Sequence, residues 1–154
     1  MPAFVASLPP WLKYAVVTVI PWIELRGAVP MAVAADERAF LPLVLLANLA
    51  IFWPGYMFLE YVYERLPEGG WVHRRLEGIR AKAHPLVERY GFIGLALFVA
   101  VPLPGTGAYS GTAAAWLLDL EPKRAFAAVS LGVVIAFALV WGSSELVAAG
   151  VRLL

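Results

Sequence analysis

Two of the four long apolar blocks in this sequence are interrupted at their centres by residues that a transmembrane helix does not readily accommodate. The block at 8–35 contains "PWIELRGAVP" at residues 21–30, and the block at 91–118 contains "VPLPGTGAYSG" at residues 101–111. Because proline has no N–H and glycine weakens a helix, a straight helix through either centre would lose backbone hydrogen bonds. Within hydrocarbon, broken backbone persists only where protein buries it or where it lines a wet cavity.

The other two blocks, at 39–63 and 125–151, are continuous, and each exceeds the roughly 20 residues needed to cross a bilayer. Composition agrees, since the chain is 62% hydrophobic and 15% charged, whereas soluble domains are about half apolar and a quarter charged. We therefore predict an all-α integral membrane protein in which both continuous blocks span. We predict that each broken block forms a re-entrant hairpin, with legs of about ten residues covering roughly half the membrane.

The two halves of the chain follow the same plan, within a single transmembrane domain over 1–154. Half one covers about 8–63, a polar segment covers 64–90, and half two covers about 91–151. Each half has a broken block, a charged link containing "RAF" and a spanning helix. If both broken blocks re-enter, an odd number of crossings separates the halves, which makes them an inverted pseudo-repeat. Many secondary transporters have this plan, with the substrate site near the midplane.

The polar segment 64–90 has Trp71, Leu76, Ile79 and Leu86 spaced for one helical face. This pattern predicts an amphipathic interfacial helix, and a solvated linker helix is the alternative. In the hairpin topology its side of the membrane collects eight Lys and Arg residues against three on the other, so we place it in the cytoplasm. A topology with four spanning blocks gives the same division, so the proline and glycine content must decide between the two.

Glu24 and Arg26 are two positions apart and would point to nearly opposite faces of a continuous helix. A charge at the bilayer centre costs about 2.5–3.5 kcal/mol even on translocon scales. In a turn beside Gly27, both groups can face one cavity. In the functional interpretation Glu24 carries a proton and Arg26 binds an anion or phosphate. In the structural interpretation the two form an ion pair that holds the hairpin.

The second break carries no charge and offers exposed backbone and hydroxyl groups. A helix starting near Ala108 would direct its N-terminus at a cavity and attract anions. Close packing of small residues is the alternative. Both histidines lie in the polar segment, so we expect no metal site in the membrane and no histidine to activate Ser110. We therefore expect a protein that is not an enzyme and needs no cofactor.

Together the two motifs resemble the small multidrug export protein family, which is distantly similar to DedA-type (SNARE-associated, VTT-like) membrane proteins. The resemblance covers about residues 15–145. It implies a re-entrant fold with internal pseudo-symmetry and, from the DedA side, proton-linked translocation of a lipid phosphate. Glu24 matches the acidic residue of the first hairpin in that group. The arginine of the second hairpin has no counterpart in residues 103–111, so Arg26 is the candidate to supply that charge.

The predicted function is transport of an anionic or amphipathic small molecule or lipid, such as a polyprenyl phosphate, across the cytoplasmic membrane. Glu24 would couple transport to protons. The substrate-binding candidates are Arg26, Gly27, Thr106, Gly107, Tyr109 and Ser110. Membrane lipids are expected partners, a homodimer is expected because four elements enclose little volume, and a net charge of +1 predicts no nucleic-acid partner. The alternative is a non-transporting scaffold or scramblase-like subunit in which Glu24 and Arg26 are structural.

Overall fold

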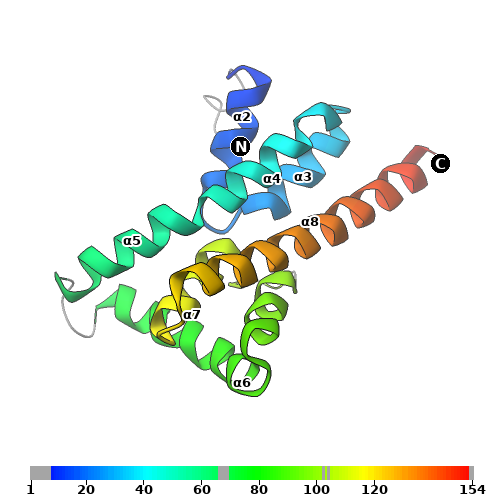
Figure 1. Cartoon of the computed structure of the whole chain (residues 1–154). Helices are drawn as coiled ribbons and strands as arrows, with labels where there is room; N and C mark the ends of the chain where they lie inside the picture. Colours follow the sequence, from blue (N-terminus) through cyan, green and yellow to red (C-terminus); the bar gives the residue numbers. More distant parts are fainter. Residues whose placement is uncertain (1–7, 66–69, 102, 104, 153–154) are drawn as a thin grey trace.

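The computed structural model describes residues 8–65, 70–101, 103 and 105–152, and every regular element within them is a helix (Figure 1). This confirms the all-α prediction. Two short 3-10 turns, η1 and η2, connect longer α-helices. The elements in chain order are α2 (Pro10–Val19), α3 (Glu24–Ala34), η1 (Arg38–Phe40), α4 (Leu41–Ala50), α5 (Phe52–Val62), η2 (Tyr63–Arg65), α6 (Trp71–Ala100), α7 (Ala108–Leu117) and α8 (Pro122–Arg152).

Two stretches of helix are long and apolar enough to cross a membrane, Arg38–Tyr61 and Pro122–Val151. They coincide with the two blocks predicted to span. The first joins η1, α4 and α5, and its helix is interrupted after Ala50. Pro54 lies four residues further on and has no N–H to donate to the Ala50 carbonyl, which explains a break at this point.

The first broken block forms α2 and α3, of 10 and 11 residues, and these helices pack against each other. The predicted leg length of about ten residues agrees with them. Between them, Trp22 has a φ of 76°, and Glu24 at the start of α3 has a φ of 47°. A left-handed conformation costs a non-glycine residue about 1–2 kcal/mol. Contacts elsewhere must therefore hold this turn in place.

The second broken block begins inside α6, which bends at Gly91 (φ 53°, ψ −125°). We call residues 71–90 the first arm of α6 and residues 92–100 its second arm. A Cβ on Gly94 would lie 1.9 Å from the Leu86 carbonyl oxygen, so the arms fold back on each other as closely as backbone atoms permit. The second arm is followed by the break and by α7. Pro102 and Pro104, which belong to the predicted break, lie outside the described residues.

The first arm is the helix predicted in the polar segment, but only part of its predicted apolar face is covered. Leu76 is buried, and Ile79 and Leu86 are half-buried. Trp71 is 61% exposed, so protein does not cover that end of the face. The face therefore packs against protein at its centre and remains open near its N-terminal end.

The longest helix, α8, contacts helices from both broken segments, α3 and α6 (Figure 1). Where it crosses the second arm of α6, a Cβ on Gly132 would lie 2.5 Å from the Ala96 carbonyl oxygen. A Cβ on Gly111 of α7 would lie 2.3 Å from Val99 Cγ2. Small residues therefore allow the second arm, α7 and α8 to approach closely, as membrane helices commonly do.

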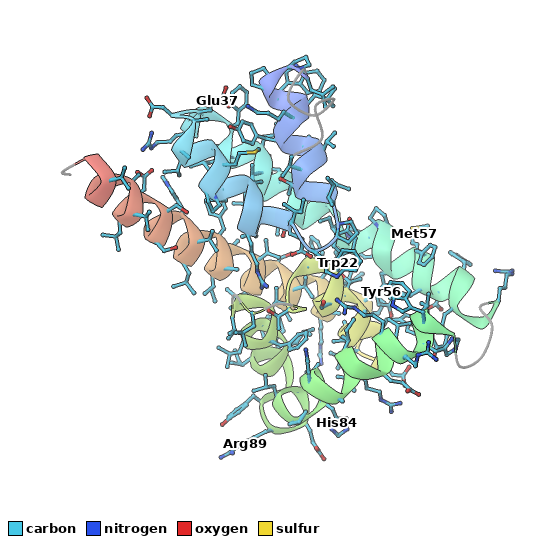
Figure 2. All side chains as sticks on the ribbon, turned by 180° about the vertical axis from the view of Figure 1, so that it is seen from behind. Trp22, Glu37, Tyr56, Met57, His84 and Arg89 are labelled. Carbon is cyan, nitrogen blue, oxygen red and sulfur yellow. The ribbon has the colours of Figure 1, made fainter. Side chains whose placement is uncertain are left out.

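A cluster of charged side chains joins the helices at one end of the molecule. Arg38 donates from Nε and Nη2 to the two carboxylate oxygens of Glu145 on α8, at 2.6 and 2.9 Å. Lys13 Nζ lies 2.7 Å from Glu37 Oε2, which also accepts from the Tyr14 hydroxyl. Figure 2 shows Glu37 at the end of the molecule opposite His84 and Arg89 of the first arm.

The Lys13–Glu37 contact gives an expected dependence of stability on pH. The hydrogen bonds from Lys13 and Tyr14 hold the pKa of the Glu37 carboxyl below its ordinary value. Its contribution is therefore present above the ordinary carboxyl pKa of about 4.3 and is lost as pH falls through the lower folded-state pKa. Glu37→Gln should be less stable than the parent at pH 7 and equally stable in acid. Unfolding of both proteins in detergent at a series of pH values measures this difference. A difference that persists unchanged in acid would contradict this assignment.

Candidate functional site

The two broken segments meet through Glu24, which is only 6% exposed. Its carboxylate accepts hydrogen bonds from the backbone N–H groups of Ala108 and Tyr109, each at 3.3 Å. These are the first two residues of α7, whose N-terminal N–H groups have no partner within the helix and carry partial positive charge. Gly107 makes the approach possible, because a Cβ there would lie 2.3 Å from Glu24 Oε2. Glu24 therefore caps a helix that begins 84 residues later.

Arg26 binds the opposite end of the second break. Its Nη2 donates to the Val101 carbonyl oxygen and to Thr106 Oγ1, both at 3.0 Å, and Nη1 donates to the Leu103 carbonyl oxygen. A longer contact of 3.4 Å reaches the carbonyl of Val99. These carbonyls lie at and beyond the C-terminal end of α6, where helical partners are missing. The carbonyls of Val101 and Leu103 also accept from the Leu103 and Thr106 backbone N–H groups and from the Thr106 hydroxyl, so the guanidinium adds charge-assisted hydrogen bonds that tie α3 to the second break.

Tyr109 makes the reciprocal contact, because its hydroxyl donates to the carbonyl of Val19, the last residue of α2. The carbonyls at the C-terminal end of α6 thus accept from Arg26, near the start of α3. In the same way, the last carbonyl of α2 accepts from Tyr109, near the start of α7. We call this set of contacts the junction. Within the described side chains no ion pair joins Glu24 to Arg26. They bind the two ends of the second break instead of each other.

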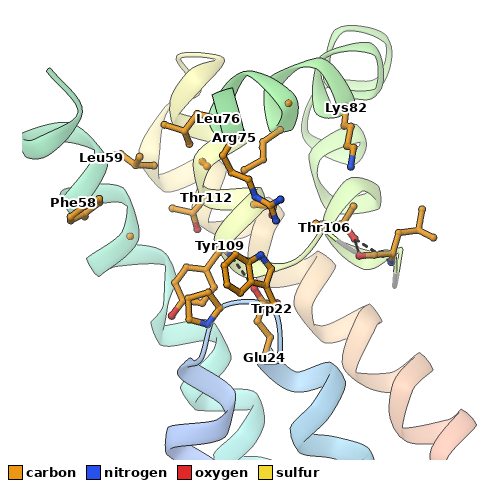
Figure 3. A pocket seen from close by; sticks show the side chains of 18 of the residues that line it. Trp22, Glu24, Phe58, Leu59, Arg75, Leu76, Lys82, Thr106, Tyr109 and Thr112 are labelled. Atoms are coloured by element: carbon orange, nitrogen blue, oxygen red, sulfur yellow. Dashed lines mark hydrogen bonds between the residues drawn. The ribbon is translucent and has the colours of Figure 1, made fainter. Parts of the chain in front are cut away.

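A cavity of about 1050 Å³ adjoins the junction. Its walls come from the turn after α2, from α5, from the first arm of α6 and from α7 (Figure 3). Five of the predicted site residues line it, namely Glu24, Arg26, Thr106, Tyr109 and Ser110. Gly27 and Gly107 are not among its described lining residues. Gly27 faces Ile23 of its own turn, and Gly107 faces the Glu24 carboxylate.

The sequence analysis missed the part of the cavity wall that the polar segment supplies. Arg74, Arg75 and Lys82 of the first arm line the cavity. Arg75 and Lys82 are seven residues apart and so share one helical face, a signal that was available in the sequence. The prediction assigned the apolar residues of this helix to a membrane interface and gave its cations no inward role.

Aromatic side chains form the apolar wall of the cavity. Trp22, on the turn after α2, is 70% exposed and stands between Glu24 and Arg75 in Figure 3. Phe58 and Trp71 contribute from α5 and α6. Among the described residues, no group of three or more His, Asp or Glu side chains is placed to hold a metal ion. The cavity combines cations with apolar surface and therefore suits an amphipathic ligand.

An all-helical fold with two stretches long and apolar enough to cross a membrane is consistent with a helical membrane protein. Residues 24–139 match the family described as "putative small multi-drug export protein". The chain belongs to this family. No curated protein and no solved structure matched it. Membership supports a transport role rather than an enzymatic one.

Proposed function

We propose that the protein is a small exporter that carries amphipathic molecules across the cytoplasmic membrane, with the cavity beside the junction as its binding site. The observation that carries this proposal is the cavity itself, about 1050 Å³ in volume and bounded on one side by two broken helical segments. Small-molecule sites are typically roughly 300–1,000 Å³, mostly apolar and provided with a few polar groups. A protein that only holds other proteins together has no need of such a space.

The proposal places the junction near the middle of the bilayer. Legs of about ten residues reach roughly 15 Å, half the hydrocarbon thickness, so α2 and α3 would enter from one face and the second arm and α7 from the other. The reciprocal contacts of Arg26 and Tyr109 support an inverted relation between the halves. The cavity would then open toward the first arm, on the cytoplasmic side, where a substrate for export must bind.

Glu24 would couple this movement to protons. As a carboxylate it accepts from the N-terminus of α7, and this interaction weakens when the group is protonated and neutral. Protonation would therefore loosen the junction and let the two helix pairs separate on the far side. Return of the carboxylate would close them again, which gives alternating access with a proton as the co-substrate.

The rival proposal is a scaffold in which Glu24 and Arg26 only hold the helices together. It is favoured by one observation, that the described contacts of both side chains are with the protein itself. Transport assays distinguish the two proposals, because a scaffold moves nothing across a sealed vesicle however stable it is.

Reconstitution into sealed liposomes tests the proposal with two amphipathic dyes, the cation ethidium and the anion 8-anilinonaphthalene-1-sulfonate. The purified protein should move at least one dye faster than empty liposomes do, and a pH gradient should accelerate it. Glu24→Gln keeps an acceptor oxygen but cannot titrate, so it should lose about tenfold or more of the gradient-driven rate. Dye exchange without a gradient should persist, and the thermal midpoint in detergent should fall only modestly, because the amide oxygen still accepts from α7 although the charge is lost.

A cavity-filling variant provides the matched control. Among the described residues, no atom beyond the local helix lies within 4 Å of a Cβ on Gly78, which lines the cavity, or on Gly142, which is in α8. Gly78→Phe should block transport and Gly142→Phe should not. If neither dye moves with the parent protein, or if both variants transport equally, the exporter proposal is wrong.

A further inference from the structure

The cation predicted to hold the substrate is already engaged by the protein. Arg26 directs Nη1 and Nη2 at the carbonyls of Val101 and Leu103 and at the hydroxyl of Thr106. An anion that entered the cavity would have to compete with these acceptors, and its binding would release the hydrogen bonds that tie α3 to the second break. The group that recognises the substrate should therefore be another cation.

Two cations of the first arm meet this requirement. Arg75 and Lys82 line the cavity, and among the described side chains no ion pair joins either of them to a carboxylate. Figure 3 shows both side chains directed into the cavity. The Arg75 guanidinium lies over the ring of Trp22, 5.6 Å from its centre. Lys82 Nζ reaches the second break, 3.7 Å from where a Cβ on Gly105 would lie.

Gly78 leaves space between these two cations. Positions 75, 78 and 82 follow the i, i+3, i+7 spacing of one helical face. A Cβ on Gly78 would meet no atom of another described element within 4 Å, so this part of the described helix surface is open between the cations. This arrangement forms a cradle with a cation on each side and bare backbone at its base.

The cavity has an apolar opening beside the cradle. Phe58 of α5 and Trp71 of α6 both line the cavity, yet they are 54% and 61% exposed. Deeper inside, a small cluster of Leu59, Leu76 and Ala113 closes the space between α5, α6 and α7. The gap between α5 and the first arm is therefore closed at its base and open at its rim, with aromatic rings on either side.

We propose that the substrate is an amphiphile with an anionic headgroup, which Arg75 and Lys82 hold at Gly78, while its apolar chain leaves between Phe58 and Trp71. The headgroup matches the charge of the two cations, and the chain matches the aromatic rim, which faces the adjacent leaflet in the proposed placement. The substrate then reaches the cavity sideways from the lipid rather than from water. This inference rests on the proposed function and specifies its substrate class.

Binding is tested with an alkyl phosphate brominated along its chain, added to protein in vesicles of neutral phosphatidylcholine. Bromine quenches the fluorescence of nearby tryptophans. The part of the quenching that is lost in the Trp22→Phe variant reports binding in the cavity. Saturable quenching of Trp22 is expected, and Arg75→Ala or Lys82→Ala should weaken it about tenfold each, as the loss of one charge-assisted contact does. Arg80→Ala removes the same charge from another face of the arm, and Arg89→Ala removes it near the end of the arm; neither residue is among the described residues that line the cavity, so both should change the apparent Kd less than twofold.

Two further ligands identify the source of the anion and its route. Inorganic phosphate should fail to compete at the concentrations at which the alkyl phosphate saturates. If it competes equally well, a free anion is the ligand and the lateral route is wrong. A brominated alkyl trimethylammonium of the same chain length should not quench Trp22 saturably. If it does, or if Arg80→Ala weakens binding as much as Lys82→Ala, the headgroup assignment is overturned.

Failure of this inference and failure of the proposed function give different results. If the liposomes move ethidium but the alkyl phosphate never quenches Trp22, the exporter stands and the anionic substrate class is wrong. If neither dye moves while the alkyl phosphate binds as expected, the site is a lipid-binding site and the exporter proposal is wrong.

Discussion

Arg26→Ala is expected to destabilise the fold by about 3 kcal/mol, because the second break loses the charge-assisted hydrogen bonds that tie it to α3. A hydrogen bond to a charged group contributes about 1.5–3 kcal/mol. The guanidinium serves the carbonyls of Val101 and Leu103 together with Thr106. Unfolding of the purified protein by a denaturing detergent, followed by circular dichroism, measures the change.

Arg26→Lys and Arg89→Ala are the controls for this expectation. An ammonium keeps the charge but lacks the planar fork, so Arg26→Lys should recover only part of the stability. Arg89 lies on the first arm against Tyr90, outside the junction, and its removal should cost less than about 0.5 kcal/mol. If Arg26→Ala unfolds at the same detergent concentration as Arg89→Ala, the junction does not depend on this side chain.

Gly94→Ala is expected to disrupt the bend of α6, with a loss of about 3 kcal/mol or more. The new Cβ would lie 1.9 Å from the Leu86 carbonyl oxygen and 2.9 Å from the Val87 nitrogen. Both are backbone atoms and cannot turn aside as a side chain could, so the arms must separate. Because the first arm forms one wall of the cavity, transport should fail together with stability.

Gly78→Ala is the matched substitution on the same helix. Its Cβ has open space, and alanine favours a helix over glycine by up to about 1 kcal/mol, so this variant should be as stable as the parent or slightly more stable. The chain has no cysteine, so spin labels on two introduced cysteines, one in each arm, report the distance between the arms directly. An unchanged distance in Gly94→Ala would show that the arms do not depend on this contact.

The sequence predicted the elements well where local chemistry determines them. Proline and charge at 21–30 interrupt the first block, and α7 begins at Ala108, where the sequence analysis expected a helix to start. The two continuous apolar blocks coincide with the two stretches able to cross a membrane. In each case a missing donor or an uninterrupted apolar run decides the outcome without help from distant residues.

The site was harder to predict because its contacts join residues far apart in sequence. Nothing near Arg26 shows that its partners are carbonyls more than 70 residues away. The bend at Gly91 depends on close contact between the two arms at Gly94, which becomes visible only after folding. Without that bend the polar segment is an ordinary surface helix, and the inward position of Arg75 and Lys82 could not be inferred.

The course of α8 has a consequence for how the halves could move. This helix contacts both α3 and the second arm of α6. A movement of the α2–α3 pair relative to the second arm and α7 would therefore change their contacts with α8. The crossing at Gly132 is close-packed, because a Cβ there would lie 2.5 Å from the Ala96 carbonyl oxygen and 2.6 Å from Val99 Cβ. Substitutions along these contacts of α8, far from the cavity and the junction, can therefore alter the rate of the proposed transport cycle while leaving substrate affinity intact.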